Sequence, residues 1–405
     1  MKRWSMLALI VFLLISTVVN AYSASPQKIT GVDTNLGSWF LIDESLGGTP
    51  DIAANPSDGH FVVTWTGTTT TPDGAMHEVR VRGFDEYNNP HWPSLKPGYR
   101  QQGEPRIAFN SQQNRYLVAW GEYDKIYARI LDATGFPIGS TPVEIWDAPI
   151  MLGGILKVVY NSTENEFLVL SQDSAGGVWG TRVASTGTAI RTLYFGESAC
   201  GGDITYNARE NIYFLVTTIH TVGRDIWGQT LDVTTGEILG ATWIESDTGD
   251  QECPRTVWNA TQNEFLVAWS DDFSGQDGVY GRRVLRSGVP DEGYVNLAAS
   301  AEGDGMTHVD GIAHDPSHGS YIVAWHDTWL GDDYREHQRS YVRSVQPDGR
   351  TPFPANAVEP EIDGAAAITS RREGNYVVVE TDPNGEIWGR HVRAWASIYL
   401  PAVQR

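Results

Sequence analysis

Basic residues are scarce in this sequence, and the shortage argues against two classes of partner. Lysine and arginine together number 29, against 50 aspartates and glutamates, so the formal net charge is −21. A chain with this charge repels nucleic acid and anionic membrane surfaces. We therefore expect a soluble monomer that binds a protein or a carbohydrate, and whose acidic surface leaves room for cations.

Enzyme motifs and helical patterns are also absent. The sequence contains no serine-bearing nucleophile elbow and no phosphate-binding loop. Beyond the N-terminal segment, the apolar positions do not follow a convincing helical period. These absences predict an all-β chain and leave no residue assigned to catalysis.

The N-terminus has the pattern of a secretory signal. Lys2 and Arg3 precede the apolar run Met6–Val19, and small residues follow as far as Ala24. This arrangement predicts a signal peptide over residues 1–24 and an extracellular or cell-surface location. The run is short for a membrane span, so an uncleaved anchor is the weaker alternative. No other segment could cross a membrane, so we expect no membrane contact after cleavage.

One short phrase recurs seven times, and its period defines the fold. Each copy is an apolar pair followed by a small residue and often by a tryptophan. Self-similarity at a period of about 50 residues is typical of propellers and solenoids. The seven copies are Val62–Trp65, Leu117–Trp120, Leu168–Ser171, Leu215–Thr218, Leu266–Trp269, Ile322–Trp325 and Val377–Glu380.

Each repeat has the pattern of four short strands. In the fifth unit, Thr256–Trp258 is a short first strand, Glu264–Trp269 and Val279–Val284 are the second and third strands, separated by a polar, glycine-rich segment, and Tyr294–Leu297 is a weaker fourth strand. Four antiparallel strands form a propeller blade, and closing the blades into a ring covers edges that an open stack would expose. We therefore predict an all-β, seven-bladed β-propeller over residues 25–395, followed by a tail at 396–405.

Ring closure requires a fourth strand for the last blade. The first unit lacks a preceding fourth strand unless the apolar segment Trp39–Ile42 supplies it. We predict that this N-terminal segment completes the seventh blade and so closes the ring. The C-terminal segment Ser397–Val403 is the alternative for the same edge.

The fifth unit carries the pattern Asn-x-x-x-Asn-x-Phe-Leu-Val-Ala-Trp, a loop and then Val-Tyr-Gly-x-Arg-Val, from Asn259 to Val284. This pattern resembles the repeats of secreted bacterial seven-bladed propellers. The resemblance is specific for architecture. It implies little about activity, because propellers serve as enzymes, lectins and docking modules alike.

The two cysteines occupy matching places in neighbouring units. Cys200 lies seven residues before Asn207, and Cys253 lies six residues before Asn259. The two asparagines are the same repeat position, so the cysteines should lie close together in space. In an oxidising compartment this predicts a disulfide, with two free thiols as the alternative.

Recurrence separates two kinds of aromatic residue. The second strands end in Trp65, Trp120, Trp269 and Trp325, and the third strands share one aromatic position at Trp179, Trp227 and Trp388. Such regular positions favour packing between blades, with the indole N–H bonded to backbone, over sugar binding. Trp329 and Tyr334 break the pattern and are therefore candidate ligand contacts.

Acidic residues recur where the loop between the second and third strands begins. That loop belongs to one face of the ring, which we call the mouth face. Five acids around one mouth would attract cations, although capping of the local turn is the favoured interpretation. The position is occupied in order by Gly67, Glu122, Asp173, His220, Asp271, Asp327 and Asp382.

Calcium is the one candidate cofactor. The segments Asp271–Gly278 and Asp327–Asp333 are rich in oxygen donors, and calcium takes six to eight oxygens. Neither segment has the alternating acidic spacing of a dedicated calcium loop. We otherwise expect no cofactor.

The sixth unit holds the remaining candidates. His308, Asp310, His326 and Asp327 should converge at its mouth. A metal site needs three or four ligands at close range, and a histidine with a carboxylate can exchange a proton, but no motif of known spacing supports either role. With Asp271, Trp329 and Tyr334, these residues form the predicted ligand-binding set.

The function that follows is a secreted, non-enzymatic binding or scaffold propeller, which recognises a protein or glycan through the loops of one face. Those loops are uneven, because Gly67–Glu78, Ser270–Gly278 and His326–Gln338 are long and Gly121–Lys125 is short. Uneven loops favour one asymmetric site. The alternatives are a glycan-active hydrolase or lyase that uses carboxylates at the mouth, and a purely structural envelope component.

Overall fold

The computed structural model divides the chain into two units, Met1–Asp33 and Thr34–Arg405, and every described residue belongs to the second. It describes residues 35–44, 46–72, 74–98, 103–147, 150–273, 276–299, 306–330, 336–351, 356–357, 367–371, 375–382 and 384–393. The predicted signal peptide at 1–24, the tail at 396–405 and Tyr334 lie outside these residues.

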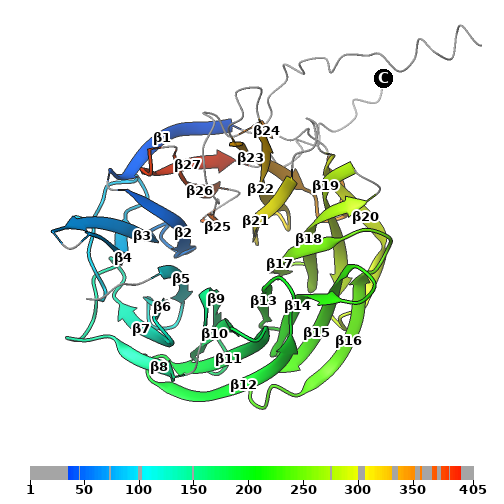
Figure 1. Ribbon diagram of the computed structural model, residues 1–405, viewed down its shortest axis with the longest axis horizontal. Coiled ribbons are helices and arrows are strands. Elements are labelled where there is room, and N and C mark those ends of the chain that lie inside the picture. The colour runs from blue at the N-terminus through cyan, green and yellow to red at the C-terminus, as the bar shows by residue number, and fades with distance from the viewer. Residues whose placement is uncertain are drawn as a thin grey trace, which may run out of the picture. The chain divides into compact units, whose positions relative to one another are not determined.

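The described strands form seven antiparallel sheets arranged around a ring, which confirms the seven-bladed β-propeller (Figure 1). Blade 1 contains β2 (Gly47–Ala54), β3 (Phe61–Thr71) and β4 (Gly74–Phe84). Blade 2 contains β5 (Gly103–Asn110), β6 (Arg115–Glu122), β7 (Lys125–Leu131) and β8 (Val143–Asp147). Blade 3 contains β9 (Ile150–Asn161), β10 (Glu166–Asp173), β11 (Gly177–Ala184) and β12 (Ala189–Glu197).

The other half of the ring follows the same order. Blade 4 contains β13 (Gly202–Asn207), β14 (Ile212–His220), β15 (Arg224–Asp232) and β16 (Ile238–Glu245). Blade 5 contains β17 (Gln251–Asn259), β18 (Glu264–Phe273), β19 (Gln276–Leu285) and β20 (Pro290–Ala299). Blade 6 contains β21 (Met306–His314), β22 (Tyr321–Leu330), β23 (Glu336–Val345) and β24 (Asn356–Ala357). Blade 7 contains β25 (Ala367–Ser370), β26 (Asn375–Thr381), β27 (Ile387–Arg393) and β1 (Asn35–Asp43).

The N-terminal strand closes the ring, as the sequence predicts. β1 pairs antiparallel with β27, and Trp39, Phe40 and Leu41 lie opposite Arg390, Gly389 and Trp388. The first described strand thus becomes the outermost strand of the last blade (Figure 1). This pairing removes the open edge that β27 would otherwise present.

The recurring apolar pair is buried on both sides, which explains why it is apolar at consecutive positions. In blade 1, Val62 packs in the cluster that includes Ile107 and Val118 of blade 2. Its neighbour Val63 packs in the cluster that includes Val377 and Val379 of blade 7. Successive strand residues point to opposite faces, so a strand between two blades needs apolar residues at both. Each blade therefore depends on its neighbours for a core.

The asparagines of the repeat join the blades on the opposite side of the ring from the mouth. Asn110 Oδ1 accepts the main-chain N–H groups of Gln112 and Gln113, both at 2.9 Å, and so caps its own turn. Its amide Nδ2 donates to Asn165 Oδ1 of the next blade at 3.0 Å. Asn165 has a φ of 51°, a conformation that asparagine tolerates well. The two asparagines of the repeat thus have different roles: Asn110 caps its own turn, and Asn165 accepts the hydrogen bond that links two blades.

Three details differ from the sequence-based expectation. Blade 1 has three strands among the described residues, with isolated bridges Val81↔Leu95 and Phe84↔Pro90 where a fourth strand would pair. The long mouth loops of units one, five and six are continuations of the strands, because β3 and β4 pair as far as Thr71↔Gly74. Blade 5 pairs as far as Phe273↔Gln276 and blade 6 as far as Leu330↔Glu336.

The third difference is a one-residue shift in the fourth unit. In blade 3, Ser171 lies opposite Trp179, whereas in blade 4 it is Thr217 that lies opposite the matching Trp227. The phrase of blade 4 is therefore Phe214–Thr217, and its mouth position falls on Ile219 rather than on His220. All regular elements of the described residues are strands, and these residues contain no helix that is long and apolar enough to span a membrane.

Candidate functional site

Every blade carries one tryptophan at one pair of facing positions, on either its second or its third strand. The pairs, second strand first, are Trp65↔Arg80, Trp120↔Tyr127, Ser171↔Trp179, Thr217↔Trp227, Trp269↔Tyr280, Trp325↔Tyr341 and Glu380↔Trp388. Blades 1, 2, 5 and 6 place the tryptophan on the second strand, and blades 3, 4 and 7 place it on the third. The recurring tryptophans therefore fill one site per blade from alternative strands.

The exposure of the tryptophan ring itself differs with the strand that carries it. The second-strand tryptophans, such as Trp120 and Trp269, are fully buried. In blades 3 and 4 the third-strand rings pack instead on fourth-strand rings, with Trp179–Tyr194 and Trp227–Trp243 centroids each 4.6 Å apart. Tyr194 is 50% exposed and Trp243 is 40% exposed. Blades 3 and 4 thus present aromatic rings to solvent near the mouth.

The partners of the indole N–H groups differ from the expected backbone. Trp179 Nε1 donates to Asp173 Oδ2 at 2.7 Å, and Trp269 Nε1 donates to Asp271 Oδ2 at 3.1 Å. Trp388 Nε1 donates to Glu386 Oε2 at 3.1 Å. These carboxylates can accept the indole N–H groups because each lies close to its ring along the chain. Asp271 and Glu386 are two residues from their tryptophans, and Asp173 is separated from Trp179 by one tight turn.

Two members of the predicted acidic ring cap turns. Asp173 Oδ1 accepts the main-chain N–H groups of Ala175 and Gly177 at 2.8 and 2.9 Å. Asp382 Oδ1 accepts those of Asn384 and Glu386 at 2.9 and 2.7 Å. Burial opposes ionisation of Asp173, but Trp179 and these N–H groups lower its pKa. At both positions the turn-capping interpretation holds.

The two cysteines form a disulfide. The Cα atoms of Cys200 and Cys253 are 5.6 Å apart and the bond closes a sequence separation of 53 residues. Cys200 lies in the link between β12 and β13, and Cys253 lies in β17. The bond therefore fastens the entry to blade 4 to the first strand of blade 5.

The structure brings together three of the predicted residues in blade 6. His308 and His326 are register partners on β21 and β22, and their ring centroids are 5.3 Å apart. His326 Nδ1 lies 2.9 Å and 3.1 Å from the two carboxylate oxygens of Asp310. Asp310 occupies a β-bulge between Val309 and Gly311, which turns its side chain toward His326.

The two histidines have opposite pKa shifts. Burial lowers the pKa of His308, and the neighbouring His326 lowers it further. Burial also opposes the charged form of His326, but the charge and hydrogen bond of Asp310 raise its pKa above the ordinary value. The arrangement therefore favours a neutral His308 beside an ion pair of His326 and Asp310.

Aspartates on the inner strands of two other blades hold main-chain groups of the next blade. Asp51 Oδ2 accepts the Ile107 N–H of the next blade at 2.9 Å, and Asp203 Oδ2 accepts the Thr256 N–H at 2.9 Å. These two aspartates tie neighbouring blades through main-chain groups. In blade 6 the matching register position is Gly311, opposite Ala324, and Asp310 lies beside it in the bulge, where its carboxylate contacts His326.

Glu380 is a functional candidate that sequence reasoning missed. It occupies the tryptophan position of blade 7, is fully buried, and neither carboxylate oxygen has a hydrogen-bond partner. Burial raises its pKa well above the ordinary value, and the charge of Asp310 adds to that rise. The sequence does carry a signal for Glu380, because it aligns with the second-strand tryptophans of four other units. A carboxyl group cannot pack at that position as an indole does.

The remaining predicted residues lie apart from this group in their contacts. Trp329, on the blade 6 hairpin, has the Arg339 guanidinium 5.4 Å from its ring centroid. Asp327 faces Thr307 and Arg339 in the register of the same sheet. Asp271 belongs to blade 5, where Gln251 Nε2 donates to its Oδ1 at 3.4 Å.

Metal-ligand geometry is limited among the described residues. Their single group of three close cysteine, histidine or carboxylate ligands is Cys200, Glu252 and Cys253. The disulfide removes both thiolates from that group. His308, Asp310 and His326 do not form such a group of mutually close ligand atoms.

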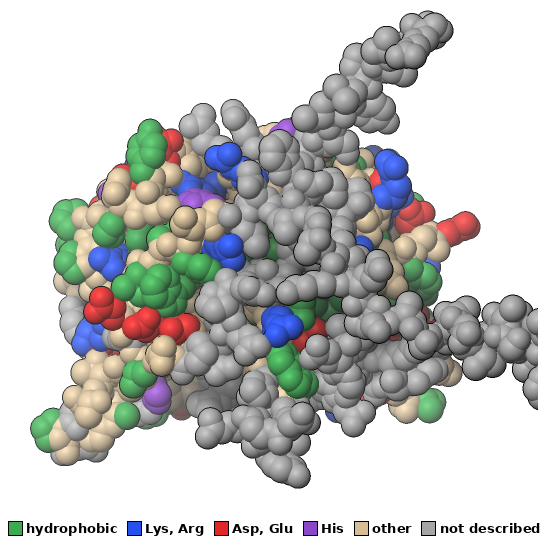
Figure 2. Space-filling model, turned by 90° about the horizontal axis from the view of Figure 1, so that it is seen from above, with side chains coloured by type: hydrophobic (Ala, Val, Ile, Leu, Met, Phe, Trp, Pro, Cys, Tyr) green, Lys and Arg blue, Asp and Glu red, His purple; other side chains and the backbone are tan. Residues whose placement is uncertain are grey.

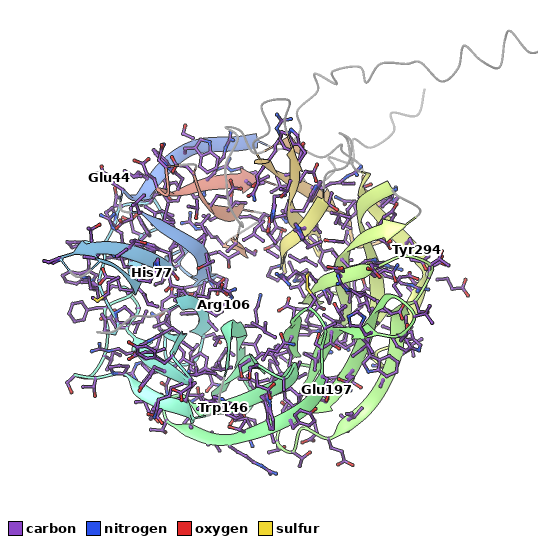
Figure 3. The ribbon with its side chains drawn as sticks, in the orientation of Figure 1. Glu44, His77, Arg106, Trp146, Glu197 and Tyr294 are labelled. Carbon is purple, nitrogen blue, oxygen red and sulfur yellow. A yellow bond between two sulfur atoms is a disulfide. The ribbon has the colours of Figure 1, made fainter. Side chains whose placement is uncertain are left out.

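The labelled side chains place these features around the ring. Arg106 lies at the inner edge, whereas Trp146 and Tyr294 lie toward the outside (Figure 3). Trp146 of blade 2 packs on Trp179 of blade 3, with centroids 5.3 Å apart. Seen from one side of the ring, acidic, basic and hydrophobic side chains are intermingled over its described surface (Figure 2). The acidic side chains that this view shows therefore do not form one continuous patch.

Comparisons with known proteins define the class of fold. A protein of unknown function from Dyadobacter fermentans has a TM-score of 0.50 at 10% identity and covers 89% of this chain and 99% of its own. The Dos1 propeller has a TM-score of 0.50 at 11% identity, with 88% and 95% covered. The WD40 domain of Toxoplasma gondii coronin has a TM-score of 0.53 at 11% identity, with 90% and 88% covered. At these identities the similarity establishes the propeller fold alone.

The sequence itself has no match of this kind. Neither a protein-family model nor a curated protein matches it. Function must therefore be argued from the site.

Proposed function

We propose that this protein is a secreted, non-enzymatic binding propeller that holds a glycan or a protein on its mouth face. The observation that carries the proposal is the unevenness of that face. Beyond its tryptophan pair, the hairpin of blade 1 runs on from Thr66↔Val79 to Thr71↔Gly74, whereas that of blade 7 ends at Thr381↔Ile387. A scaffold of equal blades needs no such difference.

The long hairpins stand on both sides of a short one. Blade 7 lies between blade 6 and blade 1 in the ring (Figure 1), and both of these neighbours carry long hairpins. The residues that depart from the repeat gather at the base of the same region, namely Glu380 of blade 7 and the His326–Asp310 pair of blade 6. This arrangement supports one asymmetric site, consistent with the uneven segments of the sequence.

Blades 3 and 5, outside the region of blades 6, 7 and 1, also expose aromatic rings beside carboxylates, and this favours a glycan as the ligand to test first. Tyr194 and Tyr294 are 50% and 55% exposed, and Glu197 and Glu245 are the carboxylates that act on their respective hydroxyl groups. An aromatic ring offers an apolar face to the C–H groups of a sugar, while carboxylate oxygens accept its hydroxyl protons. The acidic chain suits neutral glycans better than anionic ones.

The test is a glycan-array screen of the chain secreted from its full-length gene, with mass spectrometry of its N-terminus to check signal cleavage. The His326→Ala variant removes the mouth ion pair, and the His220→Ala variant removes an exposed histidine from the blade 4 hairpin as a control. We expect His326→Ala to weaken the strongest signal by about tenfold or more, and His220→Ala to leave it unchanged.

The same experiment addresses the enzyme alternative. Release of reducing ends from a bound glycan, lost in Glu380→Gln, would contradict a purely binding role and support a hydrolase or lyase. Glu380 is fully buried in this structure, so no such role is assigned to it. A glycan array without signal, together with capture of a defined protein partner, would support the binding role with a protein instead of a glycan as the ligand. Equal loss of binding in both histidine variants would contradict the mouth site.

A further inference from the structure

The seam between blades 4 and 5 carries a second cluster of oxygen-bearing side chains on the mouth face, and it uses none of the blade 6 residues. Glu245 ends β16, Gln251 begins β17, and Asp271 lies on β18. Gln251 and Asp271 are register partners, and Gln251 Nε2 donates to Asp271 Oδ1 at 3.4 Å. Tyr294 of β20 lies against Glu245, whose carboxylate helps burial to raise the pKa of Tyr294 to about 12. Both blades thus contribute oxygen atoms to one patch.

No basic side chain neutralises this patch in the described part of the chain. Glu245, Asp247 and Asp271 take part in no ion pair with lysine or arginine there. The nearby Arg282 donates to the main-chain oxygens of Asp291 and Ile244 instead, at 2.7 and 2.8 Å. Burial, followed by the charges of Glu245 and Asp247, raises the pKa of Asp271 above its ordinary value. The carboxylates are therefore crowded without a counter-charge.

Two buried oxygen atoms of the patch also lack a hydrogen-bond donor. Gln251 is 0% exposed and its Oε1 accepts no hydrogen bond. Glu245 is 7% exposed and its Oε2 accepts none, although Oε1 accepts the N–H groups of Ser246 and Asp247. Turning the Gln251 amide around would set its oxygen against the Asp271 carboxylate. Buried oxygens in this state need a donor or a cation.

We infer that Glu245, Gln251 and Asp271 bind a calcium ion in the seam between blades 4 and 5. Carboxylate and amide oxygens are the ligands that hard divalent cations take, and calcium accepts six to eight of them in flexible geometry. With the ion present, the Gln251 amide can turn so that its oxygen binds the metal. The positive charge of the ion then screens that oxygen from the Asp271 carboxylate. Waters and main-chain oxygens complete the shell, so the expected affinity is that of extracellular modules, about 10⁻⁴–10⁻³ M.

The site differs from the calcium loops that the sequence suggested. Of those loops only Asp271 takes part, and its partners come from β16 and β17 rather than from the residues that follow it. The ion would fasten blade 4 to blade 5, the same two blades that Cys200 and Cys253 join. Calcium would then stabilise the folded ring independently of any ligand on blade 6.

The test is calorimetric titration of the chelator-treated, secreted chain with calcium chloride, paired with thermal unfolding in the same solutions. Glu245→Gln keeps the side-chain size and removes the charge, and Gln251→Leu removes the orphaned oxygen. The control is Glu197→Gln, because Glu197 is an exposed carboxylate at the end of β12 in blade 3 (Figure 3). We expect the first two variants to weaken calcium binding at least about tenfold and to lose the calcium-dependent rise in Tm, whereas the control keeps both.

Two results would contradict the calcium site. An unmodified chain that binds no calcium at concentrations well above 10⁻³ M, the upper end of that range, overturns the inference. So does calcium binding that Glu245→Gln leaves intact in a folded protein, as judged by circular dichroism. Should Gln251→Leu fail to fold, Asp271→Asn replaces it, since asparagine keeps the shape and the Trp269 acceptor.

Discussion

Blades 2 and 3 are neighbours that solve one packing problem in opposite ways. Blade 2 buries Trp120 on its second strand and sets Tyr127 opposite, whereas blade 3 has Ser171 on the second strand and Trp179 opposite. In blade 2 the buried Trp120 ring stacks on the partly buried Tyr127 ring with an interplanar angle of 24°, whereas in blade 3 the Trp179 ring packs on Tyr194, which is 50% exposed. One tryptophan per blade is thus the common feature, and on the second strand of blade 2 that ring is fully buried, whereas on the third strand of blade 3 it packs on a half-exposed ring.

The largest expected effect on the free energy of unfolding is the loss of a fully buried ring, which should exceed the loss of a partly exposed ring. Trp120→Ala removes a fully buried indole and should lower the free energy of unfolding by about 3–5 kcal/mol. Trp243→Ala removes a ring of the outward kind that is 40% exposed, and should cost less than about half as much. Denaturant unfolding of both variants checks this. Equal losses would mean that the outward rings are also core.

Breaking the link between an outward blade and an inward blade should come next. The disulfide Cys200–Cys253 joins blade 4 to blade 5 across 53 residues. Its replacement by two serines should lower the free energy of unfolding by about 2–4 kcal/mol, since the unfolded chain gains freedom. Reduction of the unmodified chain is the matched control, and it should reproduce the loss. A double-serine variant as stable as the oxidised chain would show that the ring holds these blades without the bond.

Blade 7 extends the comparison of blades 2 and 3, because Glu380 occupies the buried second-strand position where blade 2 has Trp120. Burial raises the pKa of Glu380 well above 4.5, so the folded state holds this proton more tightly than the unfolded chain does. The native protein therefore loses stability as the pH rises from 4.5 toward the folded-state pKa. Glu380→Leu should remove that loss and be more stable by about 1–3 kcal/mol at neutral pH, because no buried acceptor remains unsatisfied.

The control for that substitution is Glu380→Gln, which keeps the shape and removes only the titration. Thermal unfolding across pH 4 to 8 should show a flatter profile in both variants, with the gain at neutral pH larger in Glu380→Leu. A profile in either variant that still falls like that of the unmodified chain would show that Glu380 is not the group responsible.

The sequence predicted the ring well because the features that build it are local. The apolar pair, the two asparagines and the segment Trp39–Ile42 each carry their structural signal within a few residues. The sequence does not reveal the shift in unit four, because Phe214 and Leu215 are both apolar and only the pairing of Thr217 with Trp227 shows which one begins the phrase. The sequence predicts a loop for the polar hairpin of blade 1, because its threonines show no apolar alternation.

The candidate site was less predictable, since it depends on residues brought together from different blades. His308, Asp310 and His326 were found because they are unusual within one unit, and β21 and β22 lie side by side. Glu245 and Gln251 were missed because they lie in separate strands, and a partnerless oxygen is visible only once the neighbours are placed. Whether these residues bind a ligand remains a prediction.

The exchange of tryptophan between strands is tested most directly by a double-mutant cycle in blade 3. The measurement is the free energy of unfolding of Ser171→Trp, Trp179→Tyr and the double variant, which gives blade 3 the residues of blade 2. Ser171→Trp alone places two indoles in one site and should be destabilising, whereas Trp179→Tyr in the same chain should restore about 1 kcal/mol or more beyond additivity. Additive effects of the two substitutions would contradict the account, because the facing positions would then pack independently.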